Sequence, residues 1–202
     1  GEGVTARYSA LDSLRGCSLD IVSGRKSATV RIPAIGRHLA GSFGAALACG
    51  EALGVDFETL VEGLGNFEPA PHRMEVLEAN GITIVDDSHN ANLNSVLYAL
   101  AELEQAIVGG QKIAVLGDML ELGEFAEADH RAVGSAAGFL DQLITIGDAS
   151  RLIGETASSA GIAPRRVSHY AADPTDPNSA RESIRDLAGS LRSQLREGDV
   201  VL

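Results

Sequence analysis

Hydrophobic residues follow two different patterns along the chain, and the change falls at residues 69–71, which read Pro-Ala-Pro. Before this seam, two β-type runs around a polar turn cluster predict a hairpin. An alanine-rich run, followed by an apolar run that starts with Asp, predicts two helices. These elements are expected at residues 18–22, 28–32, 38–53 and 56–63.

After the seam, short apolar runs alternate with helical patterns, which is typical of βαβ units and a largely parallel sheet. Strands are expected at residues 82–86, 112–116, 142–146, 167–170 and 199–202, with helices between them. The predicted fold class is therefore α/β, with helices flanking a mostly parallel sheet.

Two of these helices carry apolar residues at helical spacing, which predicts one face buried against the sheet. The residues are Val96, Leu97, Leu100, Leu103 and Ile107 in a helix at 92–107, and Ile184, Leu187, Leu191 and Leu195 in a helix at 179–196. The second helix opens with Ser179 and Glu182 at capping-box spacing. Residues 173–178, with two prolines, are expected to form a loop.

Composition excludes some classes of protein. The net charge of −12 over 202 residues argues against nucleic acid as a partner, although it permits a nucleotide. No apolar run approaches the roughly 20 residues that span a bilayer, so we expect a cytoplasmic protein without membrane insertion. Cys17 and Cys49 lack a CxxC spacing and are expected to be packing residues. Nothing in the pattern specifies an oligomeric state.

Polar residues follow two of the predicted strands. Residues 85–92 read Val-Asp-Asp-Ser-His-Asn-Ala-Asn, and residues 115–124 read Val-Leu-Gly-Asp-Met-Leu-Glu-Leu-Gly-Glu. Open α/β sheets bind ligands at the carboxyl ends of their strands, so both segments are candidate binding loops. Asp118 is expected to lie near Asp87 if the two strands are adjacent, and to line the cleft. Acids at a helix start are stabilising without any ligand, which is enough to explain Glu124.

Each residue of the first segment has two readings. Asp87 could accept two hydrogen bonds from a ribose diol, or it or Asp86 could cap the following helix. His89 could stack on a base or bind a phosphate, or it could be a solvated loop residue. Asn90 and Asn92 are good helix-start residues, and Asn92 could be an N-cap and nothing more.

Taken together, the two segments resemble the C-terminal region of the Mur ligases, most closely the branch that adds D-alanyl-D-alanine to UDP-MurNAc-tripeptide in peptidoglycan synthesis. That family usually reads Asp-Asp-Ser-Tyr-Asn-Ala-Asn, so His89 replaces a tyrosine. The resemblance implies that residues 1–71 are the end of the central ATPase domain, with a hairpin and helices. Residues 72–202 would be most of the Rossmann-like C-terminal domain.

The resemblance also implies a set of binding residues. The nucleotide would be contacted by Arg73, Asp87, His89, Asn90, His38 and Ser42, and the substrates by Asp118 and Asn92. No catalytic residue or metal ligand is expected in this chain, which lacks a GxxxxGK[ST] phosphate loop. The sites for the ATP phosphates and Mg²⁺ would then lie mostly upstream. For Arg73, the alternative reading is a salt bridge with Glu68 or Glu75.

One segment departs from the family. Residues 36–42 read Gly-Arg-His-Leu-Ala-Gly-Ser, where the family reads Gly-Arg-His-Asn-x-x-Asn, so Leu39 and Ser42 replace both asparagines. Those amides are implied in binding adenine, and leucine can neither donate nor accept a hydrogen bond. Either nucleotide binding is weaker, or the base is held differently, or the substrate is another one. His38 keeps the family identity, but could equally be a packed, capped residue.

The implied activity is ATP-dependent amide formation through an acyl phosphate, with this chain as an inactive fragment of the enzyme. Two other interpretations stay open. Another amide ligase of the same superfamily, of the folylpolyglutamate type, would share the fold. A non-catalytic α/β binding module would explain the replaced asparagines and the missing phosphate loop.

Overall fold

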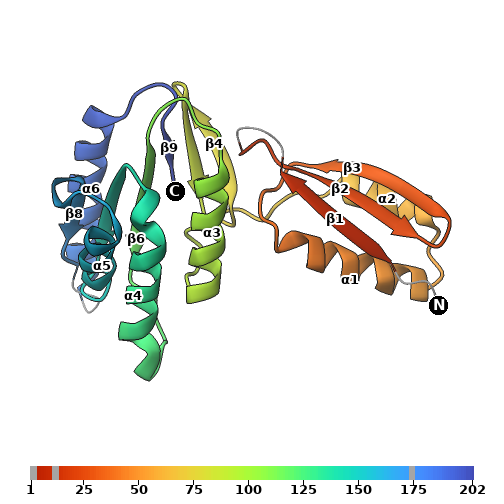
Figure 1. Ribbon diagram of the computed structural model, residues 1–202, viewed down its shortest axis with the longest axis horizontal. Helices are drawn as coiled ribbons and strands as arrows, with labels where there is room; N and C mark the ends of the chain where they lie inside the picture. Colours follow the sequence, from red (N-terminus) through yellow and green to blue (C-terminus); the bar gives the residue numbers. More distant parts are fainter. Residues whose placement is uncertain (1–3, 11–13, 173–175) are drawn as a thin grey trace. The chain divides into compact units, whose positions relative to one another are not determined.

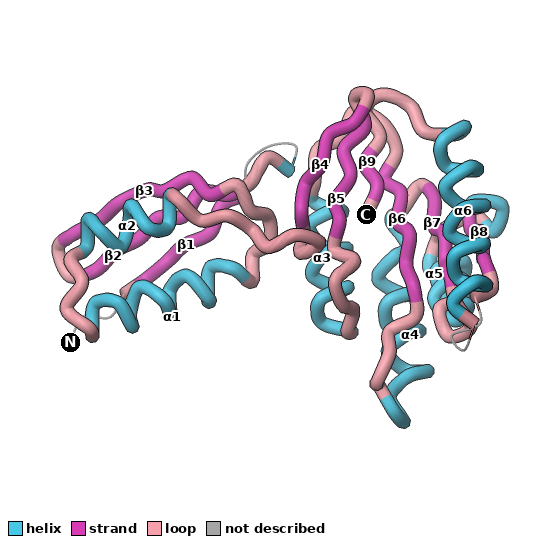
Figure 2. The backbone as a smooth tube through the Cα atoms, turned by 180° about the vertical axis from the view of Figure 1, so that it is seen from behind, coloured by secondary structure: helices cyan, strands magenta, loops and turns pink. Residues whose placement is uncertain are grey.

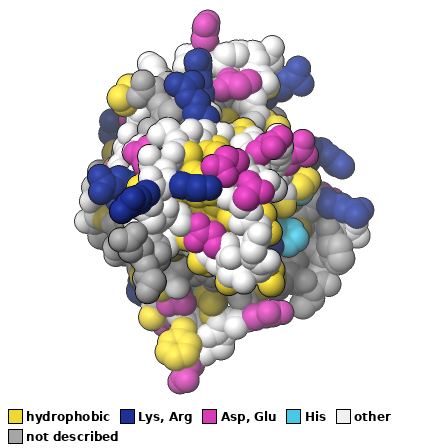
Figure 3. Space-filling model, turned by 90° about the vertical axis from the view of Figure 1, so that its right-hand side faces the viewer, with side chains coloured by type: hydrophobic (Ala, Val, Ile, Leu, Met, Phe, Trp, Pro, Cys, Tyr) yellow, Lys and Arg dark blue, Asp and Glu magenta, His cyan; other side chains and the backbone are white. Residues whose placement is uncertain are grey.

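The structure is a computed structural model that describes residues 4–10, 14–172 and 176–202. It divides into two compact units, Gly1–Val76 and Leu77–Leu202. Within the described ranges, no helix is long and apolar enough to cross a membrane. On the face shown in Figure 3, Lys and Arg side chains are interspersed with Asp and Glu side chains.

The first unit is a three-stranded antiparallel sheet with two helices. Its elements are β1 (Thr5–Ala10), β2 (Cys17–Ser23), β3 (Lys26–Ile32), α1 (Leu39–Ala52) and α2 (Phe57–Gly65). The predicted hairpin is confirmed as β2 and β3, in which Leu19 lies opposite Val30. Strand β1 was not predicted; it pairs with β2 along its whole length, with Tyr8 opposite Leu19. The predicted helix start at Asp56 is also confirmed, because this residue is the N-cap of α2.

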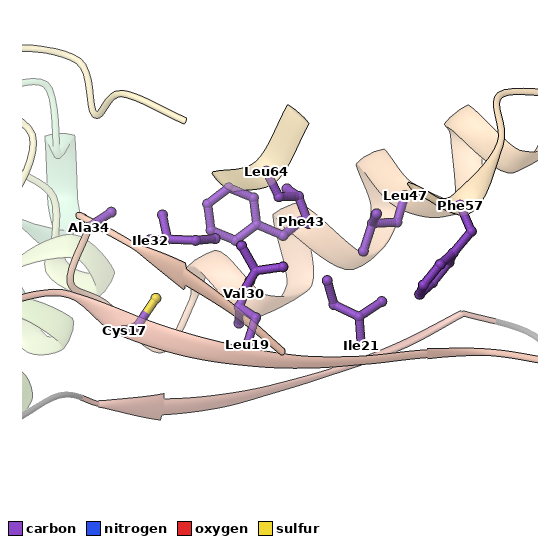
Figure 4. Packing of buried hydrophobic residues seen from close by; sticks show 10 residues of the cluster. All are labelled: Cys17, Leu19, Ile21, Val30, Ile32, Ala34, Phe43, Leu47, Phe57 and Leu64. Atoms are coloured by element: carbon purple, nitrogen blue, oxygen red, sulfur yellow. The ribbon is translucent and has the colours of Figure 1, made fainter. Parts of the chain in front are cut away.

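The core of this unit lies between the hairpin and the two helices (Figure 4). Because side chains alternate along a strand, one face of β2 and β3 supplies buried residues, which meet others from the helices. They are Cys17, Leu19, Ile21, Val30, Ile32, Phe43, Leu47, Phe57 and Leu64. Each buried leucine or isoleucine contributes about 1.5–3 kcal/mol. The packing expectation is confirmed for Cys17 and is wrong for Cys49, which is exposed on α1.

The second unit contains a six-stranded sheet in the order β4-β5-β9-β6-β7-β8. The strands are β4 (Glu75–Ala79), β5 (Ile82–Asp86), β6 (Lys112–Gly117), β7 (Gln142–Ile146), β8 (Val167–Tyr170) and β9 (Val200–Val201). Strands β5, β9, β6, β7 and β8 are parallel, and they are the five strands that the sequence predicts. The predicted α/β class is confirmed.

Helices cover both faces of this sheet. They are α3 (Leu93–Gln105), α4 (Ala126–Ala136), α5 (Arg151–Ala160) and α6 (Pro177–Gln194), with 3₁₀ turns η2 (Gly123–Phe125), η3 (Ala137–Phe139) and η4 (Pro164–Arg166). The first three helices connect strands in one direction along the sheet, whereas α6 leads back to β9. Right-handed crossovers therefore place α6 on the opposite face, as Figures 1 and 2 show.

The predicted apolar faces are largely confirmed. Leu187 and Leu191 of α6 pack with residues of three strands, and Leu100 and Leu103 of α3 are buried. The prediction of burial is wrong for two residues of these faces. Ile107 is 74% exposed because α3 ends at Gln105, and Ile184 is 55% exposed because the buried contacts of α6 begin at Leu187.

The predicted capping box of α6 is wrong. The helix begins at Pro177, and its N-cap is Asp176, whose side chain accepts a hydrogen bond from the Asn178 backbone nitrogen at 2.9 Å. An Asp-Pro pair supplies both a capping oxygen and a first helical residue with a suitable backbone angle. Of the predicted loop at 173–178, residues 173–175 lie outside the described residues and the others form this helix start.

Candidate functional site

The two polar segments follow β5 and β6 at the carboxyl edge of the parallel sheet (Figure 2). They are not on adjacent strands, because Thr83 of β5 and Lys112 of β6 both lie opposite Val200 of β9. With β9 inserted, β5 and β6 are two strand spacings apart, about 10 Å. The condition under which Asp118 was expected near Asp87, adjacent strands, is therefore not met, and residues 87–92 and 118–125 form two separate loops at one edge.

The loop after β5 begins with a turn built by Asp86. Its Oδ1 accepts a hydrogen bond from the Ser88 backbone nitrogen at 3.0 Å, which is an Asx turn. Asp87 is half-buried, whereas His89 is exposed. Neither aspartate is the cap of α3, so the capping interpretation of Asp86 and Asp87 is wrong.

The cap of α3 is Asn92. Its Oδ1 accepts from the Ser95 backbone nitrogen at 3.0 Å, and its own backbone nitrogen donates to Ser95 Oγ at 3.1 Å. This is a reciprocal capping box, so the N-cap interpretation of Asn92 is confirmed. Asn90 is exposed, and its Oδ1 accepts from the Ala91 backbone nitrogen at 2.9 Å.

Asp118, at the end of β6, is bound to the element that follows the neighbouring strand. Its Oδ1 accepts from the Ser150 backbone nitrogen at 2.7 Å, at the start of α5. Gly147, with φ +111°, makes room for this carboxylate, because a Cβ there would lie 2.4 Å from Asp118 Oδ1. Ser150 is buried, and its Oγ donates to the Gly147 carbonyl at 3.0 Å. A carboxylate at a helix N-terminus is favourable in itself.

His130 is a residue whose contacts sequence reasoning missed. It lies in α4 and is fully buried, with Nε2 3.0 Å from the Met119 backbone nitrogen and Nδ1 2.6 Å from the Ala126 carbonyl oxygen. The sequence signal was a single histidine at helical spacing from Ala126, in the helix that follows the candidate loop. Its partner Met119 is also buried. Hydrogen bonds therefore fix both residues at the start of the loop, Asp118 through Ser150 and Met119 through His130.

Most of the remaining 118–125 loop is exposed, with Leu122 half-buried. Leu120 is 67% exposed and Phe125 is 63% exposed, although both are large apolar residues. Glu121 and Gly123 have positive φ values of 61° and 56°, and such values are uncommon for a residue with a side chain. The loop therefore exposes apolar side chains at the carboxyl edge, while hydrogen bonds fix the position of its first two residues, Asp118 and Met119.

Arg73 lies in the first unit, in a backbone segment of unusual conformation. It is exposed, and its neighbours His72 and Met74 have φ values of 60° and 50°. The left-handed region costs about 1–2 kcal/mol per residue, so the surrounding contacts must hold this segment. Within the described part of the chain, Arg73 forms no ion pair with Glu68 or Glu75, and the Glu75 carboxylate instead accepts from the His72 backbone nitrogen. The salt-bridge interpretation is wrong for these two partners.

The segment that departs from the family forms the start of α1. His38 is the N-cap residue but its side chain makes no capping hydrogen bond, and it is exposed with its ring against Gly36. The interpretation of a packed, capped histidine is therefore wrong. Ser42 is exposed, whereas Leu39 is half-buried and packs on the core of the unit. Leucine at this position contributes to packing where asparagine would not.

Five parallel strands with β9 between β5 and β6, helices on both faces and polar loops at the carboxyl edge define a doubly wound α/β domain. The family described as "Mur ligase, glutamate ligase domain" matches residues 72–202, and the chain belongs to this family. The family resemblance read from the two polar segments is confirmed.

Individual relatives and solved structures are similar to the chain over much of its length. The chain is 30% identical over 178 residues to UDP-N-acetylmuramoyl-tripeptide--D-alanyl-D-alanine ligase of Bacillus subtilis, a match that covers 86% of this chain and 36% of the relative. The enzyme of the same name from Escherichia coli is 35% identical over 138 residues, which is 67% of this chain and 30% of the relative. A crystal structure of MurF from Acinetobacter baumannii superposes with a TM-score of 0.81 and 25% identity, covering all of this chain and 42% of that one. The chain thus spans less than half the length of each.

Proposed function

We propose that this chain is part of an ATP-dependent ligase that joins D-alanyl-D-alanine to UDP-MurNAc-tripeptide in peptidoglycan synthesis. The observation that carries the proposal is the similarity to ligases of that name, which covers 86% of the chain for one relative and 67% for another. Residues 72–202 are the C-terminal domain in this proposal, and residues 1–71 belong to the central ATPase domain. A ligase that uses ATP and a UDP-linked precursor works in the cytoplasm.

The nucleotide-binding residues follow from the family pattern. Asp87, half-buried at the tip of β5, accepts hydrogen bonds from the ribose, and the neighbouring His89 and Asn90 are exposed for contact with a ligand. Arg73 is exposed, and the residues on either side of it have positive φ values, a conformation that is energetically unfavourable. A guanidinium fixed in this way is suited to bind a phosphate. His38 and Ser42, at the start of α1 in the first unit, are also proposed to contact the nucleotide.

The substrate-binding residues are Asp118 and Asn92. Asp118 orients the loop that receives the dipeptide, and its bond to Ser150 supports this role by fixing where the loop starts. The cap formed by Asn92 uses its amide oxygen and not its NH₂ group, which can donate to a substrate carbonyl.

The reaction has two steps. The carboxylate of the tripeptide attacks the γ-phosphorus of ATP, which gives an acyl phosphate and ADP. The amine of the dipeptide then attacks the acyl carbon and expels phosphate, forming the amide. Bound Mg²⁺ neutralises phosphate oxygens. This chain lacks the glycine-rich loop and lysine that hold phosphates, so in this proposal most phosphate contacts come from the rest of the ligase, and this chain supplies Arg73 and the residues that orient the substrates.

Purified full-length ligase tests the proposal. We expect ADP release that requires both UDP-MurNAc-tripeptide and D-alanyl-D-alanine, and no release from the 202-residue chain alone. Release with glutamate and a folate substrate instead would replace this proposal with the folylpolyglutamate type. A native gene product of about the mass of this chain, 21.0 kDa, that binds ATP without turnover would favour the non-catalytic module.

A further inference from the structure

We infer that His130 is a positioning residue for the 118–125 loop, which it holds through the backbone nitrogen of Met119 at 3.0 Å. The inference rests on the proposed function, because it assigns this loop to the second substrate, the dipeptide. His130 itself is fully buried, so a ligand bound at the surface cannot contact it directly. Its effect passes through Met119 to the residues on either side.

The contacts of His130 define one protonation state. The Ala126 carbonyl can only accept a hydrogen bond, so Nδ1, 2.6 Å away, carries the proton. Nε2 then has a free lone pair and accepts from the Met119 nitrogen. Both ring nitrogens are used, and the ring is neutral. A side chain without an acceptor at the Nε2 position would leave the buried Met119 N–H unpaired, which is costly.

The helix that carries His130, α4, packs closely against α5. A Cβ on Gly134 would lie 2.5 Å from the Ile153 carbonyl oxygen, so the backbones of α4 and α5 approach closely at this point. Two successive loop residues are bound to this pair of helices, Asp118 to the start of α5 and Met119 to His130 of α4. The direction in which the exposed Leu120 leaves the edge is set by these two bonds.

This arrangement predicts a selective kinetic defect. If the loop receives the dipeptide, freeing Met119 weakens the dipeptide complex and leaves the nucleotide complex unchanged, because the residues proposed to bind the nucleotide lie on other segments. We expect His130→Leu in the full-length ligase to raise KM for D-alanyl-D-alanine about tenfold, equivalent to about 1.4 kcal/mol. KM for ATP should be unchanged.

Two variants separate positioning from stability. His130→Gln offers a carboxamide oxygen that can accept from Met119, so it should restore most of the dipeptide affinity. Thr145→Val removes another fully buried hydrogen-bonding group of the same unit, whose partner is His169 on β8, away from the loop. An equal rise of both KM values in His130→Leu, the same dipeptide defect in Thr145→Val, or no rescue by glutamine would overturn the inference.

Amide hydrogen exchange on the 202-residue chain tests the hydrogen bond without any ligase activity. The Met119 amide should exchange slowly in the wild type and in His130→Gln, and at least tenfold faster in His130→Leu, with the amides of β7 unchanged. A slow Met119 amide in His130→Leu overturns the inference even if the ligase is active. If the full-length protein has no dipeptide ligase activity, the proposed function fails, and exchange alone then decides whether His130 holds the loop.

Discussion

The carboxylate of Asp118 accepts a hydrogen bond from the backbone nitrogen of Ser150 at 2.7 Å, which ties the end of β6 to the start of α5. Ser150 lies in the connection that follows β7, the strand next to β6 in the sheet. One aspartate therefore links two successive βα connections at the edge where ligands of open α/β sheets bind. A binding role for Asp118 must be separated from this structural one.

Replacement of Asp118 should affect stability and kinetics differently. Asp118→Ala leaves the Ser150 N–H without its acceptor, and we expect a loss of about 1–3 kcal/mol in the free energy of unfolding, measured with urea. Asp118→Asn keeps an acceptor and should lose less. In the full-length ligase, Asp118→Ala should also raise the dipeptide KM or lower kcat. Unchanged kinetics would remove Asp118 from the substrate site and leave it the structural role.

Gly147 should not tolerate a side chain. Its φ of +111° disfavours any L side chain, and a Cβ would lie 2.4 Å from Asp118 Oδ1. We expect Gly147→Ala to lower the free energy of unfolding by at least about 2 kcal/mol. Gly189→Ala is the matched control, because Gly189 lies in α6 with nothing within 4 Å of an added Cβ. It should stabilise the helix by about 0.5–1 kcal/mol. Equal effects of the two variants would refute the steric argument.

Much of the fold could be predicted because apolar spacing is a local signal. The hairpin, the five parallel strands and the two amphipathic helices follow from it. Strand β1 was missed because its sequence has no apolar run, and β4 because its sequence, Glu-Val-Leu-Glu-Ala, shows neither an apolar run nor a regular alternation. The Asn80-Gly81 turn that joins β4 to β5 was a usable signal, since both residues have positive φ, as type I′ hairpin turns require.

The arrangement of the site was harder to predict, because it depends on contacts between distant residues. The sequence shows that Asp87 and Asp118 each follow a strand, but not that Val200, far along the chain, lies between those strands. The bond from Met119 to His130 likewise joins a loop to a helix position that local patterns treat as one more polar residue. Helix capping depends on neighbouring residues and was easier to predict from the sequence, as Asn92 shows.

Asn92 has a confirmed structural role and a proposed binding role, and two variants separate them. Asn92→Ala removes the oxygen that caps α3 and should cost about 1 kcal/mol in the free energy of unfolding. Asn92→Asp keeps a capping oxygen but loses the NH₂ group, so stability should be retained. A substrate contact through the NH₂ group then predicts a raised substrate KM for Asn92→Asp in the full-length ligase. A normal KM in this variant would leave Asn92 with only its role as the N-cap of α3.

Asp56 should make the stability of the first unit depend on pH. The Thr59 backbone nitrogen, at 2.9 Å, and then its hydroxyl, at 2.7 Å, donate to the Asp56 carboxylate and lower its pKa below the ordinary value of 3.8. The unfolded chain therefore binds this proton more readily than the folded chain. The contribution of the ionised cap is complete above the ordinary pKa and is lost as the pH falls through the folded pKa.

Urea unfolding from about pH 7 to about pH 2.5 measures this dependence. Asp56→Asn keeps a capping oxygen without a titratable proton, so the wild type should be the more stable at neutral pH, and the difference should shrink in acid. Thr59→Val removes the hydroxyl donor and keeps the backbone donor, so its pH dependence should be intermediate. If the difference between the wild type and Asp56→Asn is the same at every pH, the two hydrogen bonds do not favour the ionised carboxylate, and the cap of α2 acts through its shape alone.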